Sequence, residues 1–375
     1  MKRIKRGLKQ TMGFILTAGL IVSPVLSVSA EESANVETDT VVIQSKRYLG
    51  NVGASKLSGT ELELYNYLKQ KIQDVANGKI TSTEFDVSSI LDTSAKRQSI
   101  MQNNGQALQK INAYLLMDCP YECYWYDKEA GGGIGASYKN GISTITMAVS
   151  SEYRTSNSST YVADKAKTQE AAKVTEVAKK IVEDNADKSD YEKLLAYKDA
   201  ICDLVDYDFS DANSSSSTST KPLQLISVFD GDSNTKVVCE GYSKAFQYLC
   251  DLSDFQDEVM CYTVTGNMEG GTGSGAHMWN VVRINGNSYL VDVTNSDKGA
   301  IGQSGNLFLV SAKGSLDSSY TVGGVTYVYD DGSKDGTVNQ ADMLGENILT
   351  LATLPYSGST VTPNPTPVPT PTPDP

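Results

Sequence analysis

The chain has 375 residues, a net charge of −13 at neutral pH and an isoelectric point near 4.7. A chain this acidic repels phosphate backbones, which argues against nucleic acid as a partner. Its length is enough for one large domain or two ordinary ones.

Residues 1–30 have the layout of a secretory signal peptide. Five positive charges precede an apolar run from Phe14 to about Val28, and small residues then lead into an acidic start at Glu31. The apolar run is short for a membrane span and is broken by Ser23-Pro24, which favours cleavage over anchoring. We therefore expect a protein that is secreted or associated with the cell wall.

The other end of the chain reads as a Pro/Thr-rich linker. Seven of the eleven prolines lie between Pro363 and Pro375. Proline fixes φ and donates no backbone hydrogen bond, so this segment is expected to be an extended tether. The expected organisation is a signal peptide (1–30), a flexible segment (31–57), an N-terminal α+β region (58–165), a catalytic domain (166–355) and the linker (356–375).

The N-terminal region is predicted to contain two helices and a hairpin. The first helix starts after Ser58, which has the spacing of a capping box with Glu61. The second covers residues 94–116. Strands are expected at 121–127 ("YECYWYD") and 142–150 ("ISTITMAVS"), because both are rich in aromatic or β-branched residues and a glycine turn lies between them.

Two further helices are expected at residues 167–185 and 190–204, followed by a flexible loop of small polar residues at 213–220. Beyond the loop, "KVVCEGYSKAFQYLCDL" has apolar residues at helical spacing and predicts a helix over about 240–252.

Cys239 lies at or just before the first turn of that helix. There the free backbone N–H groups and the positive end of the helix dipole favour an anion, so a thiolate is stabilised as a nucleophile. A cysteine can equally be a small buried hydrophobic residue, a role that suits Cys250 on the same helix.

The stretch "AHMWNVVRINGNSYLVDVT" is predicted to be a β-hairpin, because Asn285-Gly286 between two apolar runs is a strong turn signal. With a two-residue turn, position 279 faces position 292. His277 and Asp292 then lie diagonally on one face, within side-chain reach. A four-residue turn keeps this parity, whereas a three-residue turn destroys it.

These residues combine into one mechanism. Cys239 would attack an acyl carbon, and His277 would take the thiol proton and return it to the leaving group. Asp292 would accept a hydrogen bond from the other imidazole nitrogen and fix the tautomer. Because His277 is the only histidine in the chain, any Cys–His enzyme here must use it.

Three segments resemble the core motifs of the transglutaminase-like superfamily, in the same chain order. They are "VVCEGYSKAFQYLC" with Cys239, "AHMWNVV" with His277 and "YLVDVT" with Asp292. Upstream, "LLAYKDAICDLVDYDF" is similar to the helix ending in a Tyr-Asp pair that precedes this core in many bacterial members. The resemblance covers about residues 190–297. "MDCPYECYWYD" is similar to a Pro-Glu-aromatic segment in the N-terminal part of secreted bacterial members and extends the resemblance to about residues 100–355.

The resemblance implies a papain-like α+β fold, with the nucleophile at a helix start packed against an antiparallel sheet that carries the His and the Asp. It also implies acyl-enzyme chemistry on amides. Animal members crosslink Gln to Lys and need calcium, whereas secreted bacterial relatives include hydrolases and proteins with no demonstrated activity. For this chain we expect no cofactor and no metal.

The donors to the oxyanion are less well specified by the sequence. The backbone N–H of Cys239 or Glu240 is one candidate. Tyr207, from the Tyr-Asp pair, and Trp279, from the histidine motif, are side-chain candidates for the oxyanion or the substrate. For Trp279 we favour core packing or a wall of the substrate groove.

The expected function is acyl transfer on protein or peptide amides, such as Gln transamidation or deamidation, with a cell-wall peptide or a host protein as substrate. One alternative is a transglutaminase-like cysteine protease that hydrolyses peptide bonds. Another is a surface adhesion or wall-binding module that keeps the triad as a relic.

Three other features of the sequence allow structural or functional interpretations. The glycine-rich loop 266–275 is a lid or an irregular hairpin loop. Residues 331–342 nearly match a calcium loop but lack flanking helices, so a Gly/Asp hairpin tip is favoured. Reserving Cys239 leaves five cysteines, an odd number, of which Cys119 and Cys123 are close enough in sequence to pair.

Overall fold

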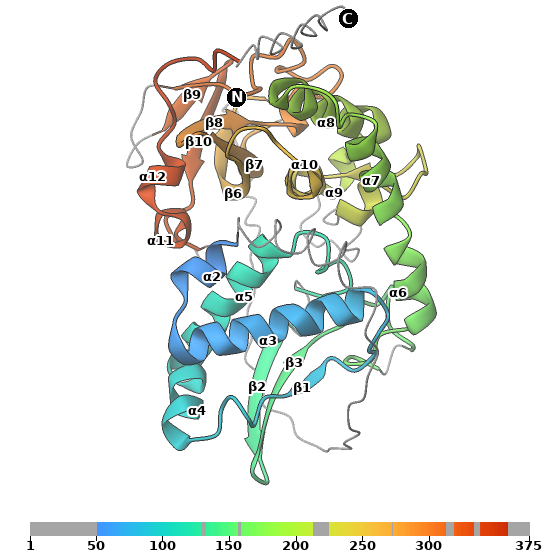
Figure 1. The fold of residues 1–375 in the computed structure, drawn as a ribbon, viewed down its shortest axis with the longest axis vertical. Coiled ribbons are helices and arrows are strands. Elements are labelled where there is room, and N and C mark those ends of the chain that lie inside the picture. Colours follow the sequence, from blue (N-terminus) through green and yellow to red (C-terminus); the bar gives the residue numbers. More distant parts are fainter. Residues whose placement is uncertain are drawn as a thin grey trace, which may run out of the picture.

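The computed structural model describes residues 51–128, 133–156, 159–212, 225–271, 273–312, 319–333 and 338–358. The predicted signal peptide, the loop at 213–220 and nearly all of the Pro-rich linker lie outside these ranges. Helices and antiparallel sheets combine into an α+β fold. The earlier part of the chain, blue to teal, lies below the later part in Figure 1.

The lower part is a helical layer over a small antiparallel sheet. Strand order is β1-β3-β2. The strands are β1 (Glu84–Asp86), β2 (Ile134–Lys139) and β3 (Ile142–Met147), and the helices are α2 (Val52–Lys56), α3 (Gly59–Ala76), α4 (Ser94–Met101) and α5 (Gln106–Asp118). Leu64, Leu68 and Ile72 recur at helical period in α3 and are fully buried, which explains its amphipathic pattern.

The predicted flexible segment 31–57 is described only from residue 51, and there Val52–Lys56 form helix α2 instead of a flexible stretch. The Asp118 carboxylate at the end of α5 accepts hydrogen bonds from the first two backbone N–H groups of α2, at 3.1 Å from Val52 and 2.7 Å from Gly53. A carboxylate at a helix start satisfies otherwise free donors.

Two local predictions in this region were wrong. Ser58 is the N-cap of α3 but makes no side-chain capping bond, and the Glu61 carboxylate pairs with Lys110 at 2.8 Å. The single helix expected at 94–116 is two helices, because Gly105 adopts a left-handed φ of 71° where α5 begins. Glycine reaches that conformation at no steric cost.

The strand predicted at "YECYWYD" is absent, and the segment forms a series of turns after α5. Its aromatic side chains cover the C-terminal end of α3. Tyr124 Oη donates to Ala76 O at 2.7 Å and Trp125 Nε1 donates to Ile72 O at 3.3 Å. The Ala76 carbonyl, in the last turn, has no partner within the helix, so the buried Tyr124 hydroxyl satisfies it. The hairpin is instead β2–β3, with its turn at Asn140-Gly141.

The upper part is built on a five-stranded antiparallel sheet of order β8-β7-β6-β10-β9. Its strands are β6 (Val259–Glu269), β7 (Gly275–Ile284), β8 (Asn287–Val291), β9 (Tyr320–Val322) and β10 (Val325–Tyr329). The helices are α6 (Lys165–Ala172), α7 (Thr175–Glu183), α8 (Asp190–Leu204), α9 (Phe209–Ala212), α10 (Cys239–Leu252), α11 (Gln340–Leu344) and α12 (Glu346–Leu349). A parallel pair of short strands, β4 (Asp206–Tyr207) and β5 (Lys236–Val237), completes it.

Helix α8 has the bounds predicted from the sequence, residues 190–204. The helix expected at 167–185 is divided into α6 and α7. At the start of α8, the Ser189 hydroxyl and the Glu192 carboxylate form a full capping box.

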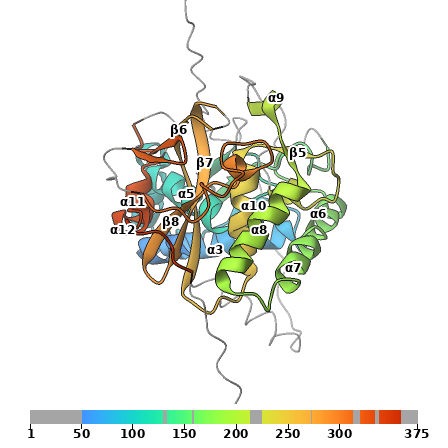
Figure 2. The ribbon, with the colours of Figure 1, turned by 90° about the horizontal axis from the view of Figure 1, so that it is seen from above.

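Helix α10 lies at the centre of the upper part, between the sheet and helices α7 and α8 (Figure 2). Every residue from Cys239 to Cys250 is buried. Its polar side chains find partners: Ser243 Oγ donates to Met278 O on β7 at 2.8 Å, and Gln247 Nε2 donates to Met117 O on α5 at 3.0 Å. Because α10 is buried and these polar side chains are hydrogen-bonded, the helix is held rigidly.

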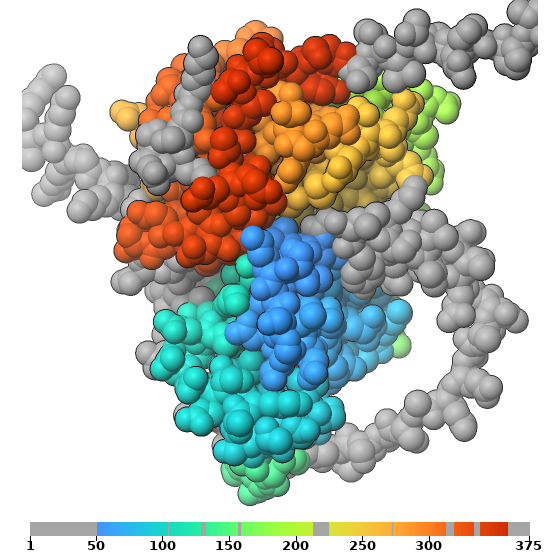
Figure 3. All heavy atoms as spheres, turned by 60° about the vertical axis from the view of Figure 1, so that its left-hand side comes forward, coloured from blue at the N-terminus to red at the C-terminus, as the bar shows by residue number. Residues whose placement is uncertain are grey.

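The two parts pack directly on each other. Tyr121 stacks on Tyr248 of α10 with ring centroids 5.2 Å apart. On another face, shown in Figure 3, the blue N-terminal helices lie against the red C-terminal segment, where Tyr114 Oη donates to Met343 O at 3.4 Å. Within the described ranges, no helix has both the length and the apolar character needed to cross a membrane.

Candidate active site

Cys239 is the first residue of α10, and Val238 is the N-cap. Val238 has no side chain that could satisfy the N–H groups of the first turn, so these donors and the helix dipole face the same end as the thiol. Gly241 allows the helix start to lie close to β5, since a Cβ there would be 2.7 Å from Val237 Cβ. The chain therefore places a thiol at a tightly packed helix N-terminus.

The hairpin β7–β8 has the predicted register. Ile284 faces Asn287 and Asn280 faces Val291, so the turn has two residues, Asn285 and Gly286. Both turn residues have positive φ, 49° and 82°, as a hairpin turn of this type requires. His277 lies in β7 and Asp292 directly follows β8, which puts their side chains on the same face.

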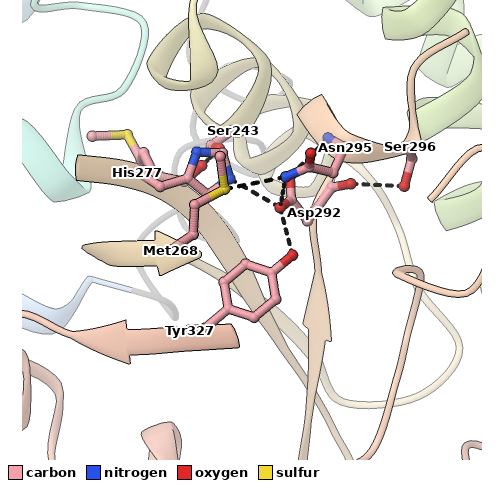
Figure 4. Close-up of polar contacts among 8 residues, drawn as sticks. Ser243, Met268, His277, Asp292, Asn295, Ser296 and Tyr327 are labelled. Atoms are coloured by element: carbon pink, nitrogen blue, oxygen red, sulfur yellow. Dashed lines mark hydrogen bonds and ion pairs between the residues drawn. The ribbon is translucent and has the colours of Figure 1, made fainter. Parts of the chain in front are cut away.

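His277 pairs with Asp292. Its Nε2 is 2.9 Å from Asp292 Oδ2 (Figure 4). The Cys239 thiol is near enough to His277 to raise the pKa of the imidazole. Because Nε2 faces the carboxylate, Nδ1 is the ring atom available to a thiol. Relative exposure is 4% for Cys239, 4% for His277 and 0% for Asp292, so the three groups interact largely out of water.

The electrostatics of the pair favour an imidazolium. Burial is the largest influence on the pKa of His277 and lowers it, but the Asp292 carboxylate and Cys239 outweigh burial and raise the pKa to about 10. For Asp292, burial raises the pKa, and His277 together with the Asn295 hydrogen bonds lowers it overall. The two directions agree, and both indicate an ion pair near neutral pH.

This ion pair predicts a pH dependence of stability. The folded-state pKa of His277 lies above the unfolded value of about 6.5, so its contribution is complete below that pH and is lost as pH rises through about 10. The Asp292 contribution is lost at the acid end, as pH falls below about 4 through its lowered pKa. Urea unfolding across the alkaline range should show a falling free energy of unfolding, and His277→Gln should remove that part of the slope. Equal slopes in both proteins would contradict the ion pair.

Asp292 is held by more donors than the sequence predicts. Its Oδ2 accepts from Asn295 Nδ2 at 2.6 Å and from Tyr327 Oη at 2.7 Å as well as from His277, and its Oδ1 accepts from the Asn295 backbone N–H at 3.0 Å. Figure 4 shows these groups converging on one carboxylate. Burial and Asp292 raise the pKa of Tyr327, so its hydroxyl keeps its proton and donates it. Four hydrogen bonds therefore fix the orientation of the Asp292 carboxylate.

Tyr207 lies near the pair, in the strand β4 that runs beside β5, where it faces Val237 two residues before Cys239. Burial raises the pKa of Tyr207, and Cys239 and Asp292 raise it further. The phenol is therefore neutral and within electrostatic reach of both groups. Its ring contacts the exposed Phe209 edge-on, with centroids 4.9 Å apart.

Trp279 is fully buried and stacks on His277, with ring centroids 6.0 Å apart and planes inclined by 16°. Its ring also stacks on that of Tyr329, with centroids 5.4 Å apart. This is the core packing favoured from the sequence. The indole supports the imidazole ring and fixes its plane.

A buried ion cluster borders the nucleophile. The Glu240 carboxylate, next in the chain to Cys239, pairs with Lys244 at 2.7 Å and also with Lys128. Burial raises the pKa of Glu240, but Lys128 and Lys244 lower it more, to about 2. Because Lys128 follows the turns after α5, the cluster ties the start of α10 to the N-terminal region.

The glycine-rich segment 266–275 covers the end of β6 and the turn into β7, and it is described except for residue 272. A Cβ on Gly271 would lie 2.4 Å from Asn295 Oδ1, so this hairpin loop packs directly on the group that holds Asp292. Of the calcium-like segment 331–342, residues 334–337 lie outside the described ranges. The rest leads from β10 into α11 rather than into the second strand of a hairpin. In the part of the chain that the structure describes, no group of three or more acidic, His or Cys side chains is arranged to hold a metal.

The structure is similar to two solved structures of low sequence identity. One is a transglutaminase, with 18% identity, a TM-score of 0.27, and coverage of 49% of this chain and 48% of that one. The other is a protein from Cytophaga hutchinsonii provisionally described as a cysteine protease, with 19% identity, a TM-score of 0.24, and coverage of 41% and 51%. The chain thus spans about half the length of each. No family model matches the sequence, and no curated protein does.

Proposed function

We propose that this protein is a transglutaminase-like cysteine enzyme that transfers the acyl group of a protein or peptide amide through a thioester on Cys239. The observation that supports the proposal is the single histidine of the chain, which is buried against a fixed carboxylate and has its pKa raised by Cys239, the thiol at the start of α10. A relic site would have no need of a carboxylate with four hydrogen bonds from its surroundings.

In the acylation step, the Cys239 sulfur attacks the amide carbon and a C–S bond forms. The His277 imidazolium gives its proton to the amide nitrogen, the C–N bond breaks, and ammonia or an amine leaves. In the second step a primary amine or water attacks the thioester, His277 takes the proton of the attacking group, and the sulfur leaves. Asp292 keeps its charge throughout and stabilises the imidazolium.

The oxyanion formed in both steps would be bound at the start of α10. The backbone N–H of Cys239 points out of the first turn and has no acceptor within the helix. The neutral Tyr207 hydroxyl is the side-chain candidate for the second donor, because of its position beside Cys239. Trp279, buried beneath His277, supports the site from the core instead.

Transfer and hydrolysis are separated by one assay. The purified protein is incubated with a glutamine peptide and a labelled primary amine. Incorporation of the amine indicates transfer, while release of ammonia or of new peptide ends without incorporation indicates hydrolysis. Mass spectrometry of the trapped Cys239 adduct from a mixed peptide pool identifies the acyl donor. If no adduct forms and iodoacetamide leaves Cys239 unmodified near neutral pH, the proposal of an enzyme is wrong.

Tyr327→Phe is expected to lower kcat about tenfold with little change in KM, which corresponds to about 1.4 kcal/mol of transition-state stabilisation. The variant removes one donor from Asp292 Oδ2 and leaves the ring in place, so the carboxylate is oriented less firmly toward His277. Tyr320→Phe is the matched control, because that hydroxyl donates to Leu349 O outside the site. Equal kcat values for the two variants would show that Tyr327 has only a structural role.

A further inference from the structure

An exposed aromatic ring stands beside the candidate active site. Phe209 is the first residue of the short helix α9 and is 59% exposed, more than any other aromatic side chain in the described ranges. In Figure 2, α9 lies at the edge of the molecule beside β5. Single apolar side chains are common on protein surfaces, so the position of this ring and the way it is held decide its meaning.

The backbone brings Phe209 to the same end of two neighbouring strands as the nucleophile. Strands β4 and β5 run parallel with Tyr207 facing Val237, and the Asp208 N–H donates to Val237 O at 3.0 Å. Neighbouring strands lie about 4.8 Å apart. Phe209 follows Tyr207 by two residues, just as Cys239 follows Val237 by two, and each of them begins a helix.

The Tyr207 ring connects Phe209 to the first turn of α10. It meets the Phe209 ring edge-on with centroids 4.9 Å apart, and its centroid is 6.4 Å from that of Tyr242, three residues after Cys239. Tyr242 is fully buried, whereas Phe209 faces solvent. The three rings therefore form a series that leads from the buried helix to the surface.

The backbone on either side of Phe209 is fixed. The Asp208 carboxylate accepts hydrogen bonds from the N–H groups of Ser210 and Asp211, both at 3.0 Å, and so caps the start of α9. The Asp208 N–H is already bound to β5. A ring that is held in place before a ligand arrives loses little conformational freedom on binding it.

We propose that Phe209 is a specificity-determining residue that binds an apolar or aromatic side chain of the acyl donor, close in the chain to the amide that Cys239 attacks. Tyr207 covers only part of the ring, and the exposed remainder can pack against an aliphatic group or a second ring. The inference rests on the function proposed above, because it needs an amide bound at Cys239. It adds a preference for donors in which apolar rather than charged side chains flank that amide.

Two chloroacetamides test the inference without a known substrate. 2-Chloroacetamide and N-benzyl-2-chloroacetamide have the same reactive carbon, from which the Cys239 sulfur displaces chloride, but only the second carries a ring. The whole chain is treated near neutral pH, and modification of Cys239 is followed by peptide mapping. Glutathione gives the ratio of the two rates for a free thiol. We expect Cys239 to favour the benzyl reagent about tenfold beyond that ratio.

Three variants assign the preference to the ring. Phe209→Ala should lose it and still react with 2-chloroacetamide at the wild-type rate. Phe209→Tyr should keep it, because the aromatic face remains. Tyr138→Ala is the matched control, since it removes another exposed ring, 48% exposed on β2 in the N-terminal region, and should also keep the preference.

The possible failures are distinguishable. No preference in the wild-type protein overturns the inference, and so does an equal slowing of both reagents in Phe209→Ala, because the residue would then act only on the structure of the site. If both reagents modify glutathione but neither modifies wild-type Cys239, the proposed function itself is wrong and the inference falls with it.

Discussion

Cys239→Ala should lower amide turnover by about 10⁴-fold or more while the protein stays folded, because the change removes the atom that would carry the acyl group. The loss is expected in kcat rather than KM, since substrate binding does not require the sulfur. Turnover is measured by ammonia release or amine incorporation, and folding by circular dichroism and Tm.

Two comparisons make this prediction specific. Cys119→Ala changes a fully buried thiol at the end of α5, in the N-terminal region, and should leave kcat unaltered. Adding His277→Ala to Cys239→Ala should cost little more than either change alone, because the two side chains act as one unit. Retained turnover in Cys239→Ala, or a large further loss in the double variant, would contradict a thiol nucleophile activated by His277.

Glu240→Ala should lower the free energy of unfolding by about 3–5 kcal/mol. The change removes the carboxylate that pairs with both Lys128 and Lys244, and it leaves their ammonium groups in a site where each side chain is 10% exposed. The desolvation cost of those charges remains while their attraction to Glu240 is lost. Urea unfolding followed by fluorescence gives the difference between variant and wild type.

Glu176→Ala provides the comparison on the surface. Glu176 pairs with Lys179 at 2.8 Å, but its side chain is 71% exposed, so its removal should have no measurable effect on unfolding. If the two variants unfold at the same urea concentration, the cluster beside Cys239 does not hold the two parts of the molecule together.

Much of the candidate site follows from short-range sequence rules. The Asn285-Gly286 turn sets the register of the hairpin, and the register places His277 and Asp292 on one face. Helical spacing in "EGYSKAFQYLCDL" locates the start of α10 and thus the position of Cys239. Each of these inferences needs only residues that are neighbours in the chain or across one turn.

The residues that fix Asp292 could not be found in the same way. Tyr327 is 35 residues further along the chain, and it reaches the carboxylate because β10 pairs with β6, which no local pattern specifies. Asn295 could have been suspected, since a polar residue three positions after an aspartate often closes a turn on its carboxylate. Which strands far apart in the sequence pair with each other depends on the packing of the whole core. A local sequence pattern therefore does not reveal the contact between Tyr327 and Asp292.

The prediction of a strand at "YECYWYD" was wrong for a related reason. Aromatic content is typical of strands, but it is equally suited to burying rings whose polar atoms find donors or acceptors elsewhere. Tyr124 and Trp125 place those atoms on carbonyls of α3, a helix that is about fifty residues earlier in the chain. The rings are buried, but the backbone that carries them forms turns rather than a strand.

The stacking of Trp279 on His277 gives the protein its own optical signal. The chain has two tryptophans, and the other, Trp125, is held in the N-terminal region against α3. In a Trp125→Phe protein all indole emission would come from a ring lying 6.0 Å from the imidazole. A positive charge against an indole face perturbs its electrons. The fluorescence of that single ring would then report the protonation of His277 directly, and stopped-flow traces could follow the proton during acylation without any labelled substrate.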